Sequence, residues 1–275
     1  MAWQFWIDRG GTFTDVVAST PANKIQTLKL LSRQPDQYQD ACVEAIRRMM
    51  KVAPGATIPS ELIQEIRMGT TVATNALLER KGAPTALFVT RGFKDALKIR
   101  YQNRPDLFAL HIEQVEALYS AVFEIEERIN ADGTVLTPLN VERSKSAIEE
   151  ALNQGYRSAA IVLMHSYKNG EHEQQLAKQV AQMGFLNVSV SHELVPLIKL
   201  IKRGDTTVLD AYLSPILHHY TKQLQAELPG VELLFMQSNG GLTFAERFNG
   251  KDAVLSGPAG GIIGALQTCR DINCN

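Results

Sequence analysis

The chain has 275 residues, of which 45% are hydrophobic and 21% charged, and its formal net charge is −1. These values are ordinary for a globular protein of one large or two smaller domains, and they argue against a nucleic-acid-binding or membrane-surface protein, which would need a basic face. No apolar run reaches the ~18 residues of a membrane span, and the three cysteines are typical of reduced thiols, so we expect a cytoplasmic protein.

The first informative segment is a hairpin with an unusual tip. An apolar run over residues 2–7 predicts a buried strand, and residues 16–18 predict its antiparallel partner. The tip between them consists of Asp8, Arg9, Gly10, Gly11, Thr12, Phe13, Thr14 and Asp15.

The composition of this tip favours binding of a phosphate. Gly10 and Gly11 let backbone N–H groups approach an anion closely. Thr12 and Thr14 add hydroxyl donors, and the carboxylates of Asp8 and Asp15 are suited to a divalent cation. The alternative is a Gly-Gly hairpin with solvated aspartates. No helix follows the tip directly, so the P-loop and dinucleotide-binding motifs do not apply.

The next predicted elements are a third strand over residues 24–30, an amphipathic helix over 38–49 and a short helix around 61–66. Residues 69–82 then predict a strand end, a turn and a helix closed by Gly82. Thr70, Thr71 and Asn75 place hydroxyls and an amide at the start of this helix. A plain N-cap needs one such residue, so the surplus favours a loop that faces a ligand.

Residues 85–190 alternate between predicted strands and helices. Strands are expected at 85–90, 122–129, 159–164 and 187–190, and helices at 141–153 and 171–183. This alternation predicts a mostly parallel sheet with helices on both faces. The polar segment 99–108, which contains Arg104, suits a small anion such as a carboxylate, although a solvated surface loop has the same composition.

The last part of the chain predicts a long helix from Asp205 to about residue 228, a strand over 231–236, and a glycine-rich segment at 255–265. In that segment we expect a strand end and then a helix start, where Gly257, Gly260 and Gly261 permit close approach to a sheet or a ligand.

Other chemistries have little support in the sequence. The six histidines form no zinc-binding pattern, and no Gly-x-Ser-x-Gly motif is present. Paired carboxylates such as Glu126 and Glu127 are interpreted as solvated.

Several of these segments resemble the hydantoinase A/oxoprolinase family, within the broader group of actin/hexokinase/Hsp70-type ATPases. The tip Asp8–Asp15 resembles the first phosphate loop of that group, and Arg9 favours the oxoprolinase branch over hydantoinase A and acetone carboxylase subunits. Seven segments match in family order: residues 8–15, 28–32, 68–82, 101–105, 203–213, 236–242 and 255–264.

The resemblance implies an α/β fold, an actin/hexokinase-like (ribonuclease H-like) ATPase lobe with a mixed sheet and flanking helices. It implies an N-terminal family domain at residues 1–200 and the beginning of a core domain at 201–275. The implied reaction opens 5-oxo-L-proline, or a related cyclic amide, to L-glutamate with hydrolysis of ATP, in the presence of Mg²⁺.

The resemblance also implies roles for individual residues. The expected phosphate contacts are Gly10, Gly11, Thr12, Thr14, Gly257, Gly260 and Gly261. Asp8 and Asp15 are expected to be catalytic and to hold the metal, and Thr70, Thr71, Asn75 and Arg104 to face the substrate.

In one respect the chain departs from the family pattern. A second Asp-x-Gly-Gly-Thr loop is expected after the glycine-rich segment, and residues 265–275 contain none. We therefore expect a second lobe to be incomplete here, and the downstream lobe and a hydantoinase B-like region to be partners that this chain needs for activity. The alternatives are an N-methylhydantoinase-like ATPase subunit, a sugar or acetate kinase of the same superfamily, and a non-catalytic fragment.

Overall fold

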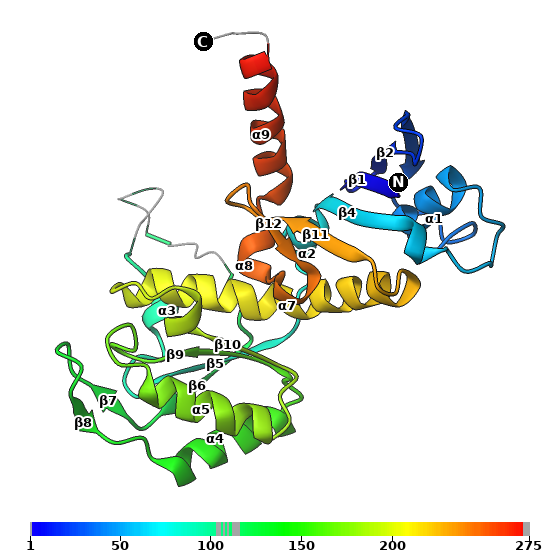
Figure 1. Ribbon diagram of the computed structural model, residues 1–275. Helices are drawn as coiled ribbons and strands as arrows, with labels where there is room; N and C mark the ends of the chain where they lie inside the picture. The colour runs from blue at the N-terminus through cyan, green and yellow to red at the C-terminus, as the bar shows by residue number, and fades with distance from the viewer. Residues whose placement is uncertain (1, 103–105, 107, 109, 112–115, 272–275) are drawn as a thin grey trace. The chain divides into compact units, whose positions relative to one another are not determined.

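The structure is a computed structural model that describes every residue except 1, 103–105, 107, 109, 112–115 and 272–275. The described chain forms two compact units (Figure 1). Unit 1 comprises Met1–Lys81 and Ile216–Asn275, and unit 2 comprises Gly82–Pro215. The chain passes from unit 1 to unit 2 after Lys81 and returns to unit 1 after Pro215, which lies inside helix α7 (Leu200–Glu227).

Unit 1 is built on a six-stranded mixed sheet with the order β12-β11-β4-β1-β2-β3. β1 (Trp3–Arg9), β2 (Phe13–Ser19) and β3 (Ile25–Leu31) form an antiparallel meander. β4 (Ile63–Thr70) and β11 (Glu232–Met236) continue the sheet in parallel with β1, and β12 (Leu242–Phe244) closes its edge. β1 is therefore a central strand, with β2 on one side and β4 on the other.

One face of this sheet carries the core of unit 1. The alternating residues Phe5, Ile7, Val16 and Ala18 are buried, because period-two alternation points them to the same side. Helix α1 (Ala41–Met49) packs there with a stripe that includes Cys42 and Ile46. The Asp40 carboxylate caps the helix by accepting from the N–H groups of residues 42 and 43.

The opposite face of the meander, which we call the open face, is solvent-exposed in the described structure. Phe13, Val17, Ile25 and Leu31 are 45%, 38%, 65% and 42% exposed. Helix α9 (Ser256–Asp271) adds exposed Ile262, Ile263 and Leu266. Unit 1 thus leaves many large apolar side chains in water.

Short elements complete unit 1. They are the 3₁₀ helices η1 (Ser60–Leu62) and η2 (Ala245–Arg247) and the helices α2 (Val72–Leu78) and α8 (Gly250–Ala253).

Unit 2 contains a four-stranded sheet, β10-β9-β5-β6, in which all neighbours are parallel. The strands are β5 (Thr85–Thr90), β6 (Ala121–Ile125), β9 (Ser158–Val162) and β10 (Asn187–Val190). Helices α4 (Val141–Asn153) and α5 (Glu171–Gln182) cover one face, where Phe88 lies in their core. The other face, with Leu87, packs on α3 (Ala96–Ile99) and the first half of α7. This confirms the predicted parallel sheet with helices on both sides.

A short hairpin and a short helix complete unit 2. β7 (Arg128–Ile129) and β8 (Val135–Thr137) form an antiparallel hairpin, and α6 (Ser191–Leu194) follows β10.

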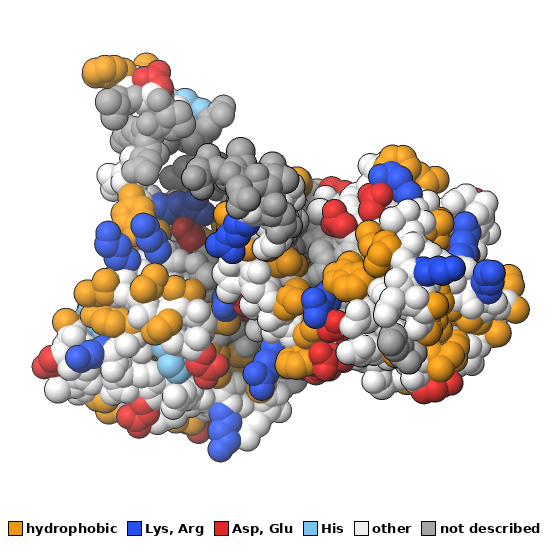
Figure 2. All heavy atoms as spheres, turned by 45° about the horizontal axis from the view of Figure 1, so that its top comes forward, with side chains coloured by type: hydrophobic (Ala, Val, Ile, Leu, Met, Phe, Trp, Pro, Cys, Tyr) orange, Lys and Arg blue, Asp and Glu red, His pale blue; other side chains and the backbone are white. Residues whose placement is uncertain are grey.

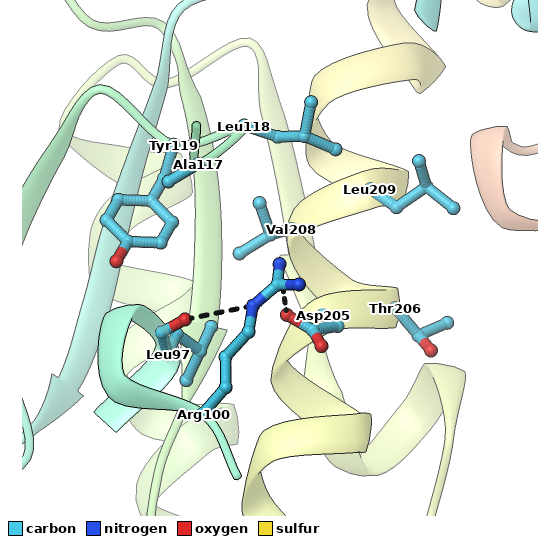
Figure 3. Close-up of a pocket in the computed structure, with 9 residues that line it drawn as sticks. All are labelled: Leu97, Arg100, Ala117, Leu118, Tyr119, Asp205, Thr206, Val208 and Leu209. Carbon is cyan, nitrogen blue, oxygen red and sulfur yellow. Dashed lines mark hydrogen bonds and ion pairs between the residues drawn. The ribbon is translucent and has the colours of Figure 1, made fainter. Parts of the chain in front are cut away.

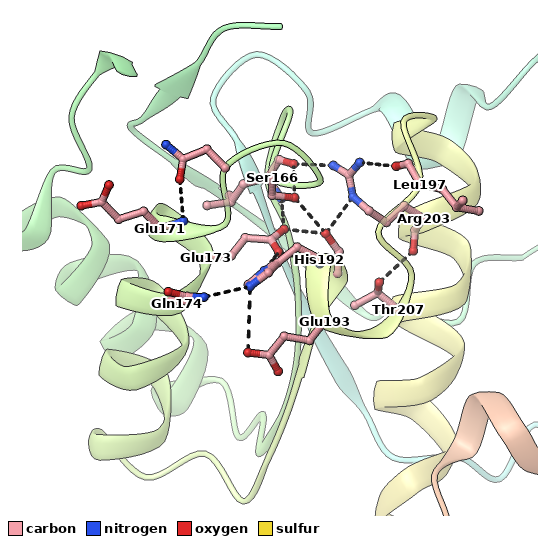
Figure 4. A network of polar contacts seen from close by, with 12 residues as sticks. Ser166, Glu171, Glu173, Gln174, His192, Glu193, Leu197, Arg203 and Thr207 are labelled. Carbon is pink, nitrogen blue, oxygen red and sulfur yellow. Dashed lines mark hydrogen bonds and ion pairs between the residues drawn. The ribbon is translucent and has the colours of Figure 1, made fainter. Parts of the chain in front are cut away.

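A buried polar network stabilises unit 2 around Glu173 (Figure 4). Its carboxylate accepts hydrogen bonds from the N–H of Leu163, the Ser191 hydroxyl, and both the N–H and Nδ1 of His192, at 2.6–2.9 Å. The fully buried Arg203 donates to the Ser191 hydroxyl at 2.8 Å and to the carbonyl of Leu163 at 2.6 Å. The donors satisfy the buried charges, which would otherwise be costly.

Four sequence-based expectations were wrong. The helix expected around residues 61–66 is only the 3₁₀ turn Ser60–Leu62, and strand β4 begins at Ile63, because Ile66 and Met68 alternate and pair with both β1 and β11. Residues 254–255 join two helices rather than ending a strand. Gly82 does not close α2, since Arg80 takes the left-handed conformation with φ 54°. Glu127 is buried and pairs with His172 at 2.7 Å instead of being solvated.

The charged surface agrees with the near-zero net charge. Acidic and basic side chains are interspersed on the face shown in Figure 2. Within the described residues, none of the helices is both long and apolar enough to cross a membrane.

The pair of His192 and Glu173 predicts a pH-dependent stability. The hydrogen bond to Glu173 raises the pKa of His192 above its usual 6.5 and outweighs the opposing effect of burial. A histidine whose pKa is higher in the folded state contributes stability below pH 6.5 and loses it as the pH rises through the folded-state value. In denaturant titrations followed by circular dichroism, the free energy of unfolding should fall as the pH rises above about 6.5. His192→Gln should flatten this slope and the exposed His219→Gln should keep it; an unchanged slope in His192→Gln would contradict the assignment.

Candidate phosphate-binding site

The tip of the first hairpin is held in a tight turn that only glycine permits. The N–H of Gly10 donates to the carbonyl of Phe13 at 3.0 Å. A Cβ on Gly10 would lie 2.9 Å from that same oxygen, which is closer than real side chains approach. Within the described residues, the N–H groups of Gly11 and Thr12 have no hydrogen-bond partner, and both residues are exposed. The tip therefore presents two unused donors, as an anion-binding loop requires.

Ser32 braces this tip from strand β3. Its N–H donates to the carbonyl of Thr12 at 2.8 Å and its hydroxyl to the carbonyl of Gly10 at 2.7 Å. The Thr14 hydroxyl lies 2.9 Å from the Ser32 hydroxyl, and Thr14 is fully buried. The geometry therefore favours an internal role for Thr14, and its expected phosphate contact stays a prediction. The sequence analysis missed the role of Ser32, because a serine at a strand end carries no motif of its own.

A second loop joins the hairpin from strand β4. The N–H and hydroxyl of Thr71 both donate to the carbonyl of Arg9, at 3.0 and 3.3 Å. The Asn75 amide donates to the Thr71 hydroxyl at 3.2 Å. A Cβ on Gly11 would lie 3.2 Å from the Asn75 amide nitrogen, so these two residues are near neighbours. The structure thus brings together Arg9 and Thr71, which are 62 residues apart in the sequence.

The start of helix α9 joins the same place. The Ser256 hydroxyl donates to the carbonyl of Thr70 at 3.0 Å, and the Thr74 hydroxyl donates to the carbonyl of Val254 at 2.6 Å. A Cβ on Gly257 would lie 3.8 Å from the methyl group of Thr71. Three loops therefore converge in unit 1, and the positive end of the 16-residue α9 dipole faces this convergence.

Two carboxylates lie beside the hairpin on the open face. Asp8 is directly opposite Asp15 in the β1–β2 register, so the two side chains project to the same side. Partial burial, and secondly the charge of Asp15, raise the pKa of Asp8 above its usual value. Lys29 donates to both oxygens of Asp15, at 2.8 and 2.9 Å. Asp8 consequently has the less compensated charge of the two.

This pair is suited to a hard cation only in combination with other ligands. Among the described residues, no group of three or more His, Cys, Asp or Glu side chains lies close enough together to hold a metal. Mg²⁺ is typically bound by one or two carboxylates, with water and phosphate oxygens completing its shell. A carboxylate pair next to a phosphate loop fits that requirement.

The side chain of Arg9 points away from the tip and anchors it to the core. Its Nε lies 3.6 Å from the Asp40 carboxylate, and its guanidinium lies 4.9 Å from the centre of the Tyr220 ring. Tyr220 is buried and its hydroxyl lies 3.5 Å from the Cys42 sulfur. Arg9 thus fixes β1 against α1 and α7. The sequence analysis did not predict this anchoring role, because it considered Arg9 only as part of the hairpin-tip motif.

Two predicted residues, Gly260 and Gly261, are not brought into this convergence. Gly260 lies against Met236, and no atom of the described residues packed around α9 would lie within 4 Å of a Cβ on Gly261. Both remain predictions as phosphate contacts. Arg104 lies outside the described residues, so its expected role also stays a prediction.

Comparison with known families identifies the family of the chain. The model of the hydantoinase/oxoprolinase N-terminal region matches residues 4–184, and the hydantoinase/oxoprolinase model matches residues 203–274. The chain is 44% identical over 295 residues to 5-oxoprolinase 1 of Arabidopsis thaliana, covering 96% of this chain and 23% of that protein. It thus spans about a quarter of the length of this relative.

Solved structures show the same fold. The ATP-dependent caprolactamase from Pseudomonas jessenii matches with a TM-score of 0.83 and 30% identity, over 98% of this chain and 40% of that one. The nucleotide-free acetone carboxylase matches with a TM-score of 0.78 and 21% identity, over 98% and 41% of the two chains, and at that identity it shows the fold alone. With family models matched along most of its length, the chain belongs to the hydantoinase/oxoprolinase family.

Proposed function

We propose that this chain is the N-terminal part of an ATP-dependent 5-oxoprolinase, which converts 5-oxo-L-proline, ATP and water to L-glutamate, ADP and phosphate. The observation that carries the proposal is the convergence of the hairpin tip, the segment Thr71–Asn75 at the start of α2, and the start of α9 in unit 1. The 44% identity to a 5-oxoprolinase supports the choice of substrate. The meander followed by two parallel strands supports an actin/hexokinase-like lobe.

Each part of the site has a role in this proposal. The free N–H groups of Gly11 and Thr12 bind phosphate oxygens, while Gly10 and Ser32 keep the turn tight. Asp8, with Asp15 beside it, holds Mg²⁺ directly or through water. In the assembled enzyme with Mg·ATP bound, Thr71 and Asn75 face the cyclic amide, and Thr70, buried at the end of β4, precedes them. When bound, ATP supplies the phosphoryl group that activates the resonance-stabilised amide carbonyl toward water, and the chain contributes positioning and charge neutralisation.

We further propose that the downstream lobe and a hydantoinase B-like region act as partners. The chain covers 23% of the length of the Arabidopsis relative, so most of that architecture has no counterpart within it. The open face and α9 expose Phe13, Ile25, Leu31 and Ile262, a set of apolar side chains that a partner would cover.

Reconstitution tests the proposed function. We expect the chain alone to release no phosphate and form no glutamate from 5-oxo-L-proline. Mixing it with a separately expressed polypeptide that supplies the downstream family regions should give both products in equal amounts. Hydantoin and caprolactam serve as alternative substrates, and a preference for either would shift the assignment within the family. Substantial turnover by the chain alone would refute the need for partners.

Asp8→Asn separates the metal-binding role from a structural one. Because the pKa of Asp8 is raised, its charged form is disfavoured in the fold, and stability falls as the pH rises above the unfolded value of 3.8. At neutral pH the variant should therefore be as stable as the parent or slightly more so, within about 0.5 kcal/mol. Its thermal stabilisation by Mg·ATP should be smaller.

The matched control for this variant is the exposed Asp36→Asn, which should keep the full Mg·ATP shift. Thermal unfolding with and without Mg·ATP measures both effects. A full shift in Asp8→Asn would remove Asp8 from the metal site.

A further inference from the structure

Unit 2 contains a cavity of about 280 Å³ that the proposed function does not use (Figure 3). It lies between α3, the segment that precedes β6, and the first half of α7. The residues that line it are Leu97, Arg100, Ala117, Leu118, Tyr119, Asp205, Thr206, Val208 and Leu209. The volume is sufficient for one small ring compound and too small for a nucleotide.

The walls of the cavity are mostly apolar. Leu97 and Val208 belong to the core cluster on this side of the unit 2 sheet and are only 3% and 4% exposed. Leu118 packs against the same cluster, and Leu209 adds a further aliphatic wall from α7. A ligand that binds here would gain from burying a compact apolar body.

The guanidinium of Arg100 is the positively charged group that lines the cavity. Figure 3 shows the Arg100 guanidinium between α3 and α7. Its Nε donates to the carbonyl of Leu97 at 3.3 Å, and its Nη2 lies 3.4 Å from the Asp205 carboxylate. The remaining nitrogen, Nη1, has no partner among the described residues. Arg100 also has a φ of 53°, in the left-handed region that residues with a side chain rarely adopt. Such strained backbone conformations are found most often at binding and active sites.

Two other polar groups border the cavity. The Tyr119 hydroxyl makes no hydrogen bond within the described part of the chain, and partial burial raises its pKa, so it remains a neutral donor. The Asp205 carboxylate, 42% exposed, is the acceptor on the α7 side. A cation with a free donor, a free hydroxyl and a carboxylate acceptor are thus arranged around an apolar space.

We propose that this cavity binds a small carboxylate with a compact cyclic body, whose carboxylate pairs with Arg100 and whose ring lies against Leu97, Leu118 and Val208. A planar guanidinium recognises a carboxylate through paired N–H donors. An amide N–H on the ring would donate to Asp205. The choice of 5-oxo-L-proline as the probe rests on the proposed function, whereas the cavity and its charges do not.

The test compares two ligands that differ only in the carboxylate. Titration calorimetry of the full chain, without ATP or the partner regions that complete the unit 1 site, should show saturable binding of 5-oxo-L-proline and binding of 2-pyrrolidinone that is at least about tenfold weaker. Equal affinity for the two ligands, or no saturable binding of 5-oxo-L-proline, would overturn the proposal.

Variants locate the site. Arg100→Met should weaken binding of 5-oxo-L-proline by about tenfold or more, while Arg91→Met, which removes an exposed arginine of the same unit, should leave it unchanged. Leu118→Trp should block binding by filling the cavity. The thermal midpoint of each variant confirms that it is folded. Parent-like affinity in Arg100→Met or in Leu118→Trp would overturn the proposal.

Failure of this inference and failure of the proposed function give different results. If Asn75→Ala loses binding and Arg100→Met keeps it, the ligand lies in unit 1 and only the inference fails. If binding depends on Arg100 but reconstitution yields no glutamate, the proposed function fails and the cavity remains a carboxylate site.

Discussion

The candidate site depends on the pairing of strand β1 with β4, which ends in two hydrogen bonds from Thr71 to the carbonyl of Arg9. β1 carries the hairpin tip, and β4 leads directly into the loop with Asn75. Because the two strands are parallel, their carboxyl ends lie at the same edge of the sheet, where ligands of open α/β sheets bind. The helix α9 reaches this edge through Ser256 and the carbonyl of Thr70. Without the β1–β4 pairing, nothing would hold the hairpin tip, the Thr71–Asn75 segment and the start of α9 next to one another.

Close backbone approach is the second requirement of this arrangement. Gly10 and Gly11 have no room for a side chain without displacing the carbonyl of Phe13 or the amide of Asn75. The same edge keeps two like charges, Asp8 and Asp15, in cross-strand register, although burial and, secondly, the charge of Asp15 raise the pKa of Asp8. Two neighbouring carboxylates repel each other and lower the stability of the fold when no cation is bound. Such a cost is typical of binding sites, where function and stability often conflict.

Much of this could be predicted from the sequence, and the rest could not, for physical reasons. Elements with a clear period, such as α4 and the strands β5 and β10, were predicted with nearly correct bounds. The first half of β4 was mistaken for a helix, because this strand is determined by pairing with β1 and β11, which lie far away in the sequence. The tip and the Thr71–Asn75 loop were recognised separately, while their contact, the brace from Ser32 and the anchor from Arg9 emerge only in three dimensions.

Hydrogen–deuterium exchange measured with and without Mg·ATP tests the central claim most directly. The account predicts that Mg·ATP slows exchange together in three segments of unit 1, residues 9–15, 69–76 and 255–262, with the amides of Gly11 and Thr12 among those protected. The unit 2 sheet should exchange as before. Protection confined to another region, or exchange at the hairpin tip that Mg·ATP leaves unchanged while it binds, would contradict the assignment of this edge as the phosphate site.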